Sequence, residues 1–147
     1  AGVWIEGELD ENNFSDIEKT ISTNTLGSIY LSKAVIPQMK KQKSGLIINI
    51  ISQAGIYAKA KRTVYNASKW AITGFTKSLQ SELAEHGISV TGIYPGKLKT
   101  GLFRKAGIDK DMDDALDPEY VAKTIEFILS FENAINFPEI GIKHIRG

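Results

Sequence analysis

Residues 52–69 read SQAGIYAKAKRTVYNASK, and they join two segments of different character. The preceding run, residues 46–51, is short and apolar, which is typical of a buried parallel strand. The following run, residues 63–86, has a helical pattern of apolar residues, and Gly87 is placed to end it. The stretch therefore predicts a strand-to-helix connection, the repeating unit of α/β folds.

Two Tyr and Lys pairs in this stretch share a four-residue spacing, Tyr65 with Lys69 and Tyr57 with Lys61. The first pair opens the predicted helix, where this spacing puts both side chains on one face. The second pair falls in the connection, where nothing fixes a helical geometry. A neighbouring ammonium lowers the pKa of a phenol from about 10, so Tyr65 is the candidate general acid. Ser52, at the carboxyl end of the strand, would orient the same substrate oxygen.

Five features of the chain fit together in order and spacing. They are Ala1-Gly2, Asn24 in Asn-Thr-Leu-Gly, Ser52 thirteen residues before Tyr65, the pair Tyr65-x-x-x-Lys69, and Pro95-Gly96-x-x-x-Thr100. In these features the chain resembles the short-chain dehydrogenase/reductase family, over essentially all of its length. The resemblance implies an NAD(P)-dependent oxidoreductase that interconverts a carbonyl and an alcohol by hydride transfer, with Tyr65 as general acid/base.

The resemblance also implies roles for individual residues. The catalytic set would be Asn24, Ser52, Tyr65 and Lys69, with Lys69 lowering the pKa of Tyr65 and Asn24 bending its helix and holding a water of the proton relay. The cofactor, NAD or NADP, would contact Gly2, Tyr65, Lys69, Pro95, Gly96 and Thr100. Lys69 would bond the nicotinamide ribose, and no metal is implied. Residues 97–116 correspond to the family's substrate-binding lid, which is its most variable part. The resemblance therefore implies a small carbonyl or alcohol substrate without identifying the compound.

The remaining elements complete an α/β prediction. Residues 15–42 form a helix with a Ser15–Glu18 capping box and a bend or end at Pro37. Its predicted apolar face comprises Ile17, Ile21, Leu26, Ile29, Tyr30, Ala34 and Val35. A strand over 88–94, a helix over 117–130 opened by Asp117-Pro118, and a strand over 137–145 follow. We expect one domain, 1–147, with a partial Rossmann-type fold: a three-stranded, mainly parallel sheet flanked by helices.

No glycine-rich phosphate turn, G-x-x-x-G-x-G or G-x-G-x-x-G after a strand, occurs in the chain. By resemblance, residues 1–147 are the C-terminal part of an NAD(P)-binding Rossmann-fold dehydrogenase, and the residues that distinguish NAD from NADP precede them. We therefore expect the chain alone to be inactive, with strand 46–51 as a sheet edge. The alternative function is a catalytically inactive fragment that acts as a helix-mediated dimerisation or interaction module.

The small residues Ala67, Ala71 and Gly74 favour close helix packing, either within the chain or with a second copy. The family resemblance implies the second, a homodimer or tetramer through helices 15–42 and 63–86. Lysines 40, 41 and 43 complement a helix C-terminus, which explains them without nucleic acid.

Composition narrows the class of protein further. The 147 residues include 42% hydrophobic and 24% charged residues, as in a globular domain. The net charge of +1 gives no case for nucleic-acid binding. The absence of cysteine fits a reducing compartment, and no apolar run has membrane-spanning length. We expect a soluble, cytoplasmic protein without a signal peptide.

Overall fold

The computed structural model describes residues 2–132 and 134–146. Three strands, β1 (Gly45–Ile50), β2 (Ile88–Pro95) and β3 (Glu139–Ile142), form one sheet in the order β1-β2-β3. Both strand pairs are parallel, with Ile47 opposite Val90 and Ile93 opposite Ile140. The predicted three-stranded parallel sheet is thus confirmed. The last strand is shorter than the predicted 137–145.

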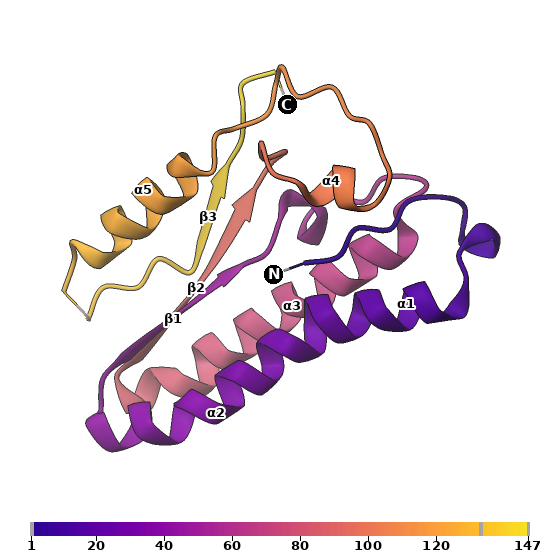
Figure 1. The fold of residues 1–147 in the computed structure, drawn as a ribbon. Helices are drawn as coiled ribbons and strands as arrows, with labels where there is room; N and C mark the ends of the chain where they lie inside the picture. The colour runs from indigo at the N-terminus through magenta and orange to yellow at the C-terminus, as the bar shows by residue number, and fades with distance from the viewer. Residues whose placement is uncertain (1, 133, 147) are drawn as a thin grey trace.

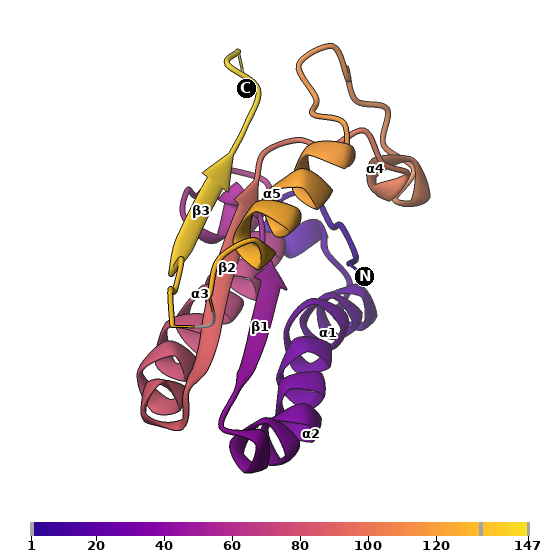
Figure 2. The same cartoon turned by 90° about the vertical axis from the view of Figure 1, so that its left-hand side faces the viewer.

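Helices cover both faces of the sheet (Figure 1). On one face lie α1 (Phe14–Ile21), α2 (Gly27–Gln42) and α3 (Thr63–Leu83), and α5 (Glu119–Leu129) lies on the other. Within the described part of the chain, β1 has no strand beyond it, and Figure 2 shows it at the edge of the sheet, beside α1 and α2. The expectation that this apolar strand forms a sheet edge is confirmed.

The first helical segment differs from the predicted single helix over 15–42. It begins at Phe14, and the side chain of Asn13 caps it by accepting a hydrogen bond from the Asp16 N–H. The predicted Ser15–Glu18 capping box is therefore wrong, because the helix starts before Ser15. A π-helical turn, Ser22–Leu26, separates α1 from α2. The helix then continues through Pro37 to Gln42, so this proline does not end it.

The predicted apolar face of this segment is only partly buried: Ile17, Ile21 and Ile29 are half-buried, and its other four residues are exposed. The fully buried side chains of the segment are small and polar: Thr20, Asn24, Thr25 and Ser32. Small side chains let the segment approach α3 closely, and Thr25 Oγ1 donates a hydrogen bond to the Ser68 carbonyl of α3. Tyr30, from the predicted face, is 62% exposed.

The second long helix matches its prediction. α3 spans Thr63–Leu83, a 3-10 turn (Ala84–His86) follows, and Gly87 ends it in the left-handed conformation with φ of 68°. Its buried side contributes Leu79 and Leu83 to the main apolar cluster, completed by Ile47, Ile88 and Val90 of the strands. This cluster fixes the helix against β1 and β2.

The outer side of α3 is not an intrachain packing face. Ala67, Trp70, Ala71 and Gly74 are exposed, and a Cβ added at Gly74 would meet no atom within 4 Å. The small residues Ala67, Ala71 and Gly74 are predicted from the sequence to pack either within the chain or against a second copy. Packing within the chain is excluded for the described residues.

The C-terminal half closes the second layer. α5 begins at Glu119, whose N–H donates to Asp117 Oδ1, and it ends at Leu129, close to the predicted 117–130. Residues 97–116 are mostly irregular and contain one short helix, α4 (Leu102–Lys105). No helix among the described residues is long and apolar enough to cross a membrane.

Leu83 is fully buried in the main apolar cluster, so we expect Leu83→Ala to lower the free energy of unfolding by about 2–5 kcal/mol. Urea denaturation monitored by circular dichroism measures the change. The matched control is Leu129→Ala, since Leu129 is 62% exposed and should cost at most about 0.5 kcal/mol. Equal losses in both variants would contradict the placement of the core.

Candidate active site

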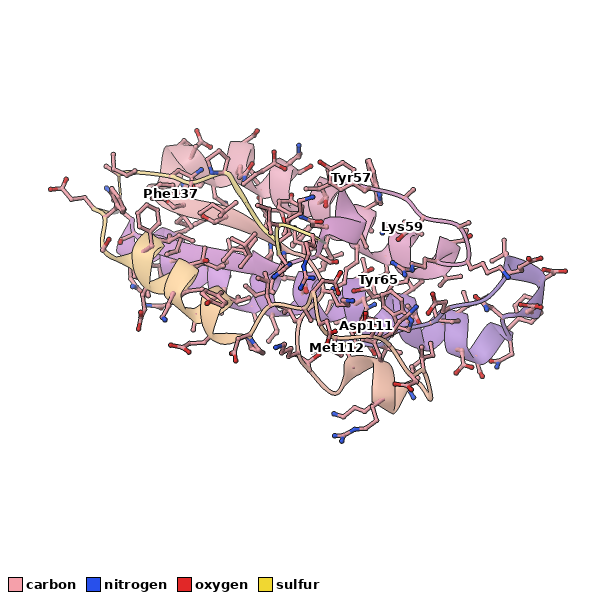
Figure 3. The ribbon with its side chains drawn as sticks, turned by 90° about the horizontal axis from the view of Figure 1, so that it is seen from above. Tyr57, Lys59, Tyr65, Asp111, Met112 and Phe137 are labelled. Carbon is pink, nitrogen blue, oxygen red and sulfur yellow. The ribbon has the colours of Figure 1, made fainter. Side chains whose placement is uncertain are left out.

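A groove of about 1420 Å³ runs along β1 and across the carboxyl ends of the strands. Figure 3 looks down on this end of the molecule, with Tyr65 between the loop that carries Lys59 and the loop that carries Asp111. Of the eight predicted site residues, seven line the groove: Gly2, Ser52, Tyr65, Lys69, Pro95, Gly96 and Thr100. The eighth, Asn24, is not in its wall, and Ala1 lies outside the described residues.

Ser52 and Tyr65 meet where a strand ends and a helix begins. Ser52 lies just after β1, and its side chain is hydrogen-bonded to Tyr65 in the first turn of α3. Its backbone, at φ 153° and ψ 158°, is in a region that costs a non-glycine residue on the order of 1–3 kcal/mol. Ser52 Oγ also accepts a hydrogen bond of 3.1 Å from the Ala54 N–H, which helps to hold this turn.

Lys69 lies one helical turn beyond Tyr65, with its Nζ 5.7 Å from the centre of the tyrosine ring. The side chain is buried, and no acidic partner is present among the described residues. Burial lowers the pKa of Lys69 to about 8, because a low-dielectric environment disfavours the charged form. The site therefore holds a buried, uncompensated amine facing the groove.

The predicted lowering of the Tyr65 pKa is not what the structure shows. Burial raises this pKa, and the hydrogen bond to Ser52 and the charge of Arg62 only partly oppose it. The burial has a clear source, since the ring of Trp4 packs against that of Tyr65 at a centroid distance of 4.3 Å and a tilt of 50°. Lys69 lies over the ring and is not among the groups that act on the pKa of the phenol.

Asn24, in the π-helical turn, clamps the N-terminal segment to α3. Its Oδ1 accepts from the Val3 N–H at 2.8 Å, and its Nδ2 donates to the Val3 carbonyl at 2.9 Å. The same Nδ2 donates to Ser68 Oγ at 3.1 Å, and Ser68 in turn donates to the Tyr65 carbonyl. The side chain thus ties Val3 to the turn that carries Tyr65. Its predicted role in a proton relay stays a prediction.

Pro95 is the last residue of β2, and the predicted cofactor residues Gly96 and Thr100 lie in the irregular turn that follows it. The Gly96 N–H donates to the Ile142 carbonyl at 2.8 Å, and a Cβ at Gly96 would lie 3.0 Å from the Lys143 Cβ. The close approach explains why glycine occupies this position. Thr100 Oγ1 accepts from the Leu102 N–H at 3.4 Å, so it links the turn to α4.

The second Tyr–Lys pair does not have the geometry of the first, although Tyr57 lines the same groove. Tyr57 is 63% exposed and lies outside any helix, and Lys61 has a left-handed backbone with φ of 61°. Lys61 Nζ pairs instead with Glu8, at 3.6 Å. The preference for Tyr65 and Lys69 from sequence context agrees with this geometry.

The sequence prediction missed a cluster of side chains around Tyr65. Trp4 also packs edge-on against Phe103 of α4 at 4.8 Å, and the Arg62 guanidinium lies 5.0 Å from the Trp4 ring centre. Glu6 pairs with Lys110 and Arg62. These residues come from three separated segments, so no motif or spacing could point to the cluster. No group of His, Cys, Asp and Glu in the described chain could hold a metal ion.

Comparison with known proteins identifies the family of the chain. The short chain dehydrogenase family profile matches residues 1–111. An uncharacterized oxidoreductase of Staphylococcus saprophyticus is 34% identical over 145 residues, covering 99% of this chain and 61% of the relative. A solved structure, the closed form of serine dehydrogenase complexed with NADP+, has a TM-score of 0.91 at 26% identity, over 100% of this chain and 63% of that one.

A third similar protein is 4-hydroxyisoleucine dehydrogenase complexed with NADH and succinate, with a TM-score of 0.83 at 27% identity. It is matched over 100% of this chain and 66% of its own length. The chain thus spans a little over half of the proteins it matches, and the matching part contains the whole described site. From its profile match, its relatives and its fold, this chain belongs to the short-chain dehydrogenase family.

Proposed function

We propose that these residues form the reaction end of an NAD(P)-dependent oxidoreductase that interconverts a carbonyl and an alcohol. The observation that carries the proposal is the meeting of Ser52, Tyr65 and Lys69 on one groove wall, with the hydroxyl groups of Ser52 and Tyr65 hydrogen-bonded. Relatives that bind NADP+ or NADH support a nicotinamide cofactor, without deciding between the two. A small carbonyl or alcohol compound is the proposed substrate.

In this proposal Tyr65 donates a proton to the substrate oxygen during reduction and takes it back during oxidation. Ser52 donates a hydrogen bond to the same oxygen and orients it. The raised pKa of Tyr65 keeps the phenol protonated at neutral pH, which suits a general acid. The burial of Tyr65 under Trp4 also excludes water from the proton transfer. A bound nicotinamide cofactor supplies or accepts the hydride.

The residues present fit the nicotinamide end of such a cofactor. The Lys69 amine, buried and without an acidic partner, has hydrogen-bonding capacity that the ribose hydroxyls would use. Gly2, Pro95, Gly96 and Thr100 line the groove beside it. The phosphates have no glycine-rich turn in this sequence. We therefore propose that residues 1–147 are part of one Rossmann-type domain and are inactive alone.

We expect Tyr65→Phe to lower the rate of carbonyl reduction by about 10²–10⁴-fold, because the proton donor is lost. The rate is measured by NADPH or NADH oxidation in the natural protein that contains these residues. The matched control is Tyr120→Phe, which removes the hydroxyl of an exposed tyrosine outside the groove and should keep the rate. A Tyr65→Phe variant with full activity would refute the assignment.

Direct titration of the 147-residue chain with NADPH and NADH tests the cofactor proposal. No saturation at millimolar cofactor is expected if the phosphates have no site in this chain. Saturable binding would show that the chain alone is sufficient and would overturn its proposed inactivity.

The partner-free amine of Lys69 should make stability depend on pH. The folded pKa, about 8, is below the ordinary 10.5, so the unfolded chain holds this proton more tightly. The free energy of unfolding should therefore rise between pH 8 and 10.5. Below pH 8 it should be reduced by the full cost of burying the charged amine. We expect Lys69→Met to increase the unfolding free energy at pH 7 by about 1–3 kcal/mol and to flatten this rise. Urea denaturation at pH 7 and 10 measures both effects.

Lys33→Met is the control for that experiment, since Lys33 is exposed. It should keep the pH dependence of the parent chain. A rise in stability with pH that is the same in Lys69→Met and the parent would contradict the buried, unpaired amine.

We further propose that the exposed face of α3 pairs with a second copy, giving a homodimer or tetramer. Gly74 lies on this face with Ala67, Trp70 and Ala71, and it leaves room for a helix backbone. On the neighbouring segment, Tyr30 is 62% exposed. The same face would serve the alternative function, an interaction module that no longer catalyses.

Gly74→Arg should convert the oligomer to a monomer without unfolding it. The substitution meets no atom within 4 Å in the chain and replaces glycine in a helix by a better helix former, but it fills the proposed contact. Sedimentation velocity measures the mass, with the exposed loop variant Asn136→Arg as control. An unchanged mass for Gly74→Arg would exclude this face as the interface.

A further inference from the structure

Positive charge is concentrated in the groove. The chain has 18 Lys and Arg and 17 Asp and Glu in total. Among the residues that line the groove, one is acidic, Asp114, and eight are basic: Lys59, Arg62, Lys69, Lys97, Arg104, Lys105, Lys110 and Lys143. In Figure 3, Lys59 lies on one side of Tyr65 and the lid residues Asp111 and Met112 lie on the other. The groove is thus strongly cationic, although the whole chain has a net charge of only +1.

Two of these cations share one carboxylate next to Tyr65. Glu6 Oε1 lies 3.0 Å from Lys110 Nζ and 3.5 Å from Arg62 Nε, and Glu6 Oε2 accepts from Trp4 Nε1 at 3.2 Å. Burial acts to raise the pKa of Glu6, but the hydrogen bonds of Lys110 and Trp4 and the two positive charges lower it overall. Glu6 is therefore ionised at neutral pH, and its single charge cannot neutralise both cations.

The surplus charge is shielded from solvent and close to the reacting phenol. The side chains of Arg62 and Lys110 are each 26% exposed, and that of Glu6 is 22% exposed. Arg62 meets Glu6 through its Nε, at 3.5 Å. The charge of Arg62 reaches the Tyr65 hydroxyl strongly enough to act on its pKa. The planar fork of a guanidinium matches the geometry of a carboxylate.

We propose that the substrate of this site is a carbonyl compound that carries a carboxylate, which Arg62 and Lys110 hold beside Tyr65. This inference rests on the proposed function, because it places the substrate carbonyl at Ser52 and Tyr65. Glu6 orients the two cations and competes with the substrate carboxylate for them. Trp4 and Phe103 form the apolar wall next to the bound carbon chain.

Trp4 provides a direct report of binding. The chain has two tryptophans, and Trp70 is exposed on the outer face of α3. In a Trp70→Phe background, the emission change that disappears on Trp4→Phe reports on Trp4, which contacts Tyr65, Phe103 and Arg62. The probes are 4-oxopentanoate and its neutral analogue 4-oxopentanamide, with inorganic phosphate as a second anion. Each is titrated into the natural protein with and without NADP+. This oxidised cofactor has no hydride to donate, so the ketone is not reduced during the titration.

We expect 4-oxopentanoate to bind at least about tenfold more tightly than the amide, since a charge-assisted hydrogen bond is lost in the amide. Arg62→Gln and Lys110→Gln should each weaken binding of the carboxylate by about tenfold and leave the amide unchanged. Glu6→Gln should tighten the binding of 4-oxopentanoate several-fold, because the competing carboxylate of Glu6 is removed. The control Lys61→Gln removes a neighbouring, exposed cation that has its own partner, Glu8. It should change neither the affinity for 4-oxopentanoate nor that for the amide.

The sign of the Glu6→Gln effect separates ligand binding from a structural role. If the Glu6–Arg62–Lys110 cluster only holds the fold, all three variants weaken binding or lower the melting temperature together, and the proposal is overturned. Equal affinity for the acid and the amide overturns it as well. Tighter binding of phosphate than of 4-oxopentanoate would replace the carboxylate by a phosphate group and refute the stated substrate class.

Turnover is measured separately with NADPH and NADH. Reduction of the amide as fast as the acid would leave the oxidoreductase proposal standing and remove the carboxylate inference. Selective binding of the carboxylate, without turnover and without any effect of the cofactor, would support the carboxylate site and contradict the oxidoreductase proposal.

Discussion

The parallel pairing of β1 with β2 is the constraint on which the site depends. Because the strands run in the same direction, Ser52 after β1 and Pro95 at the end of β2 come to the same edge of the sheet. The crossover between them contains α3, which the apolar cluster around Leu83 fixes against the strands. Tyr65, in the first turn of α3, thereby meets Ser52 at the strand end. A slip of the helix by one turn would separate these hydroxyl groups.

Polar contacts inside the fold complete the arrangement. The segment from α1 to α2 buries small polar side chains. The side chain of Asn24 accepts a hydrogen bond from the Val3 N–H through Oδ1 and donates one to Ser68 Oγ through Nδ2. Through this clamp the N-terminal segment is held so that Trp4 covers Tyr65. The covering accounts for the raised pKa of Tyr65, and it shows that the environment of this tyrosine is set by residues far away in the chain.

Charge has the same dependence on the folded arrangement. A net charge of +1 gave no reason to consider an acidic ligand, and the positions of lysine and arginine along the chain are dispersed. Folding brings eight of them to one groove and leaves most acidic residues elsewhere. Within that groove, Lys69 is buried without an acidic partner, so its altered pKa arises from desolvation and not from a local sequence pattern.

The amino-acid sequence alone determined the α/β class, the three-stranded parallel sheet, the bounds of α3 and the preference for Tyr65–Lys69 over Tyr57–Lys61. These features depend on apolar periodicity, on Gly87 and on a four-residue helical spacing, which are local and visible in sequence. Only the tertiary structure decided the polar inner face around Asn24 and the cluster of Trp4, Glu6, Arg62 and Lys110. These depend on contacts between segments up to 104 residues apart, which no local pattern encodes.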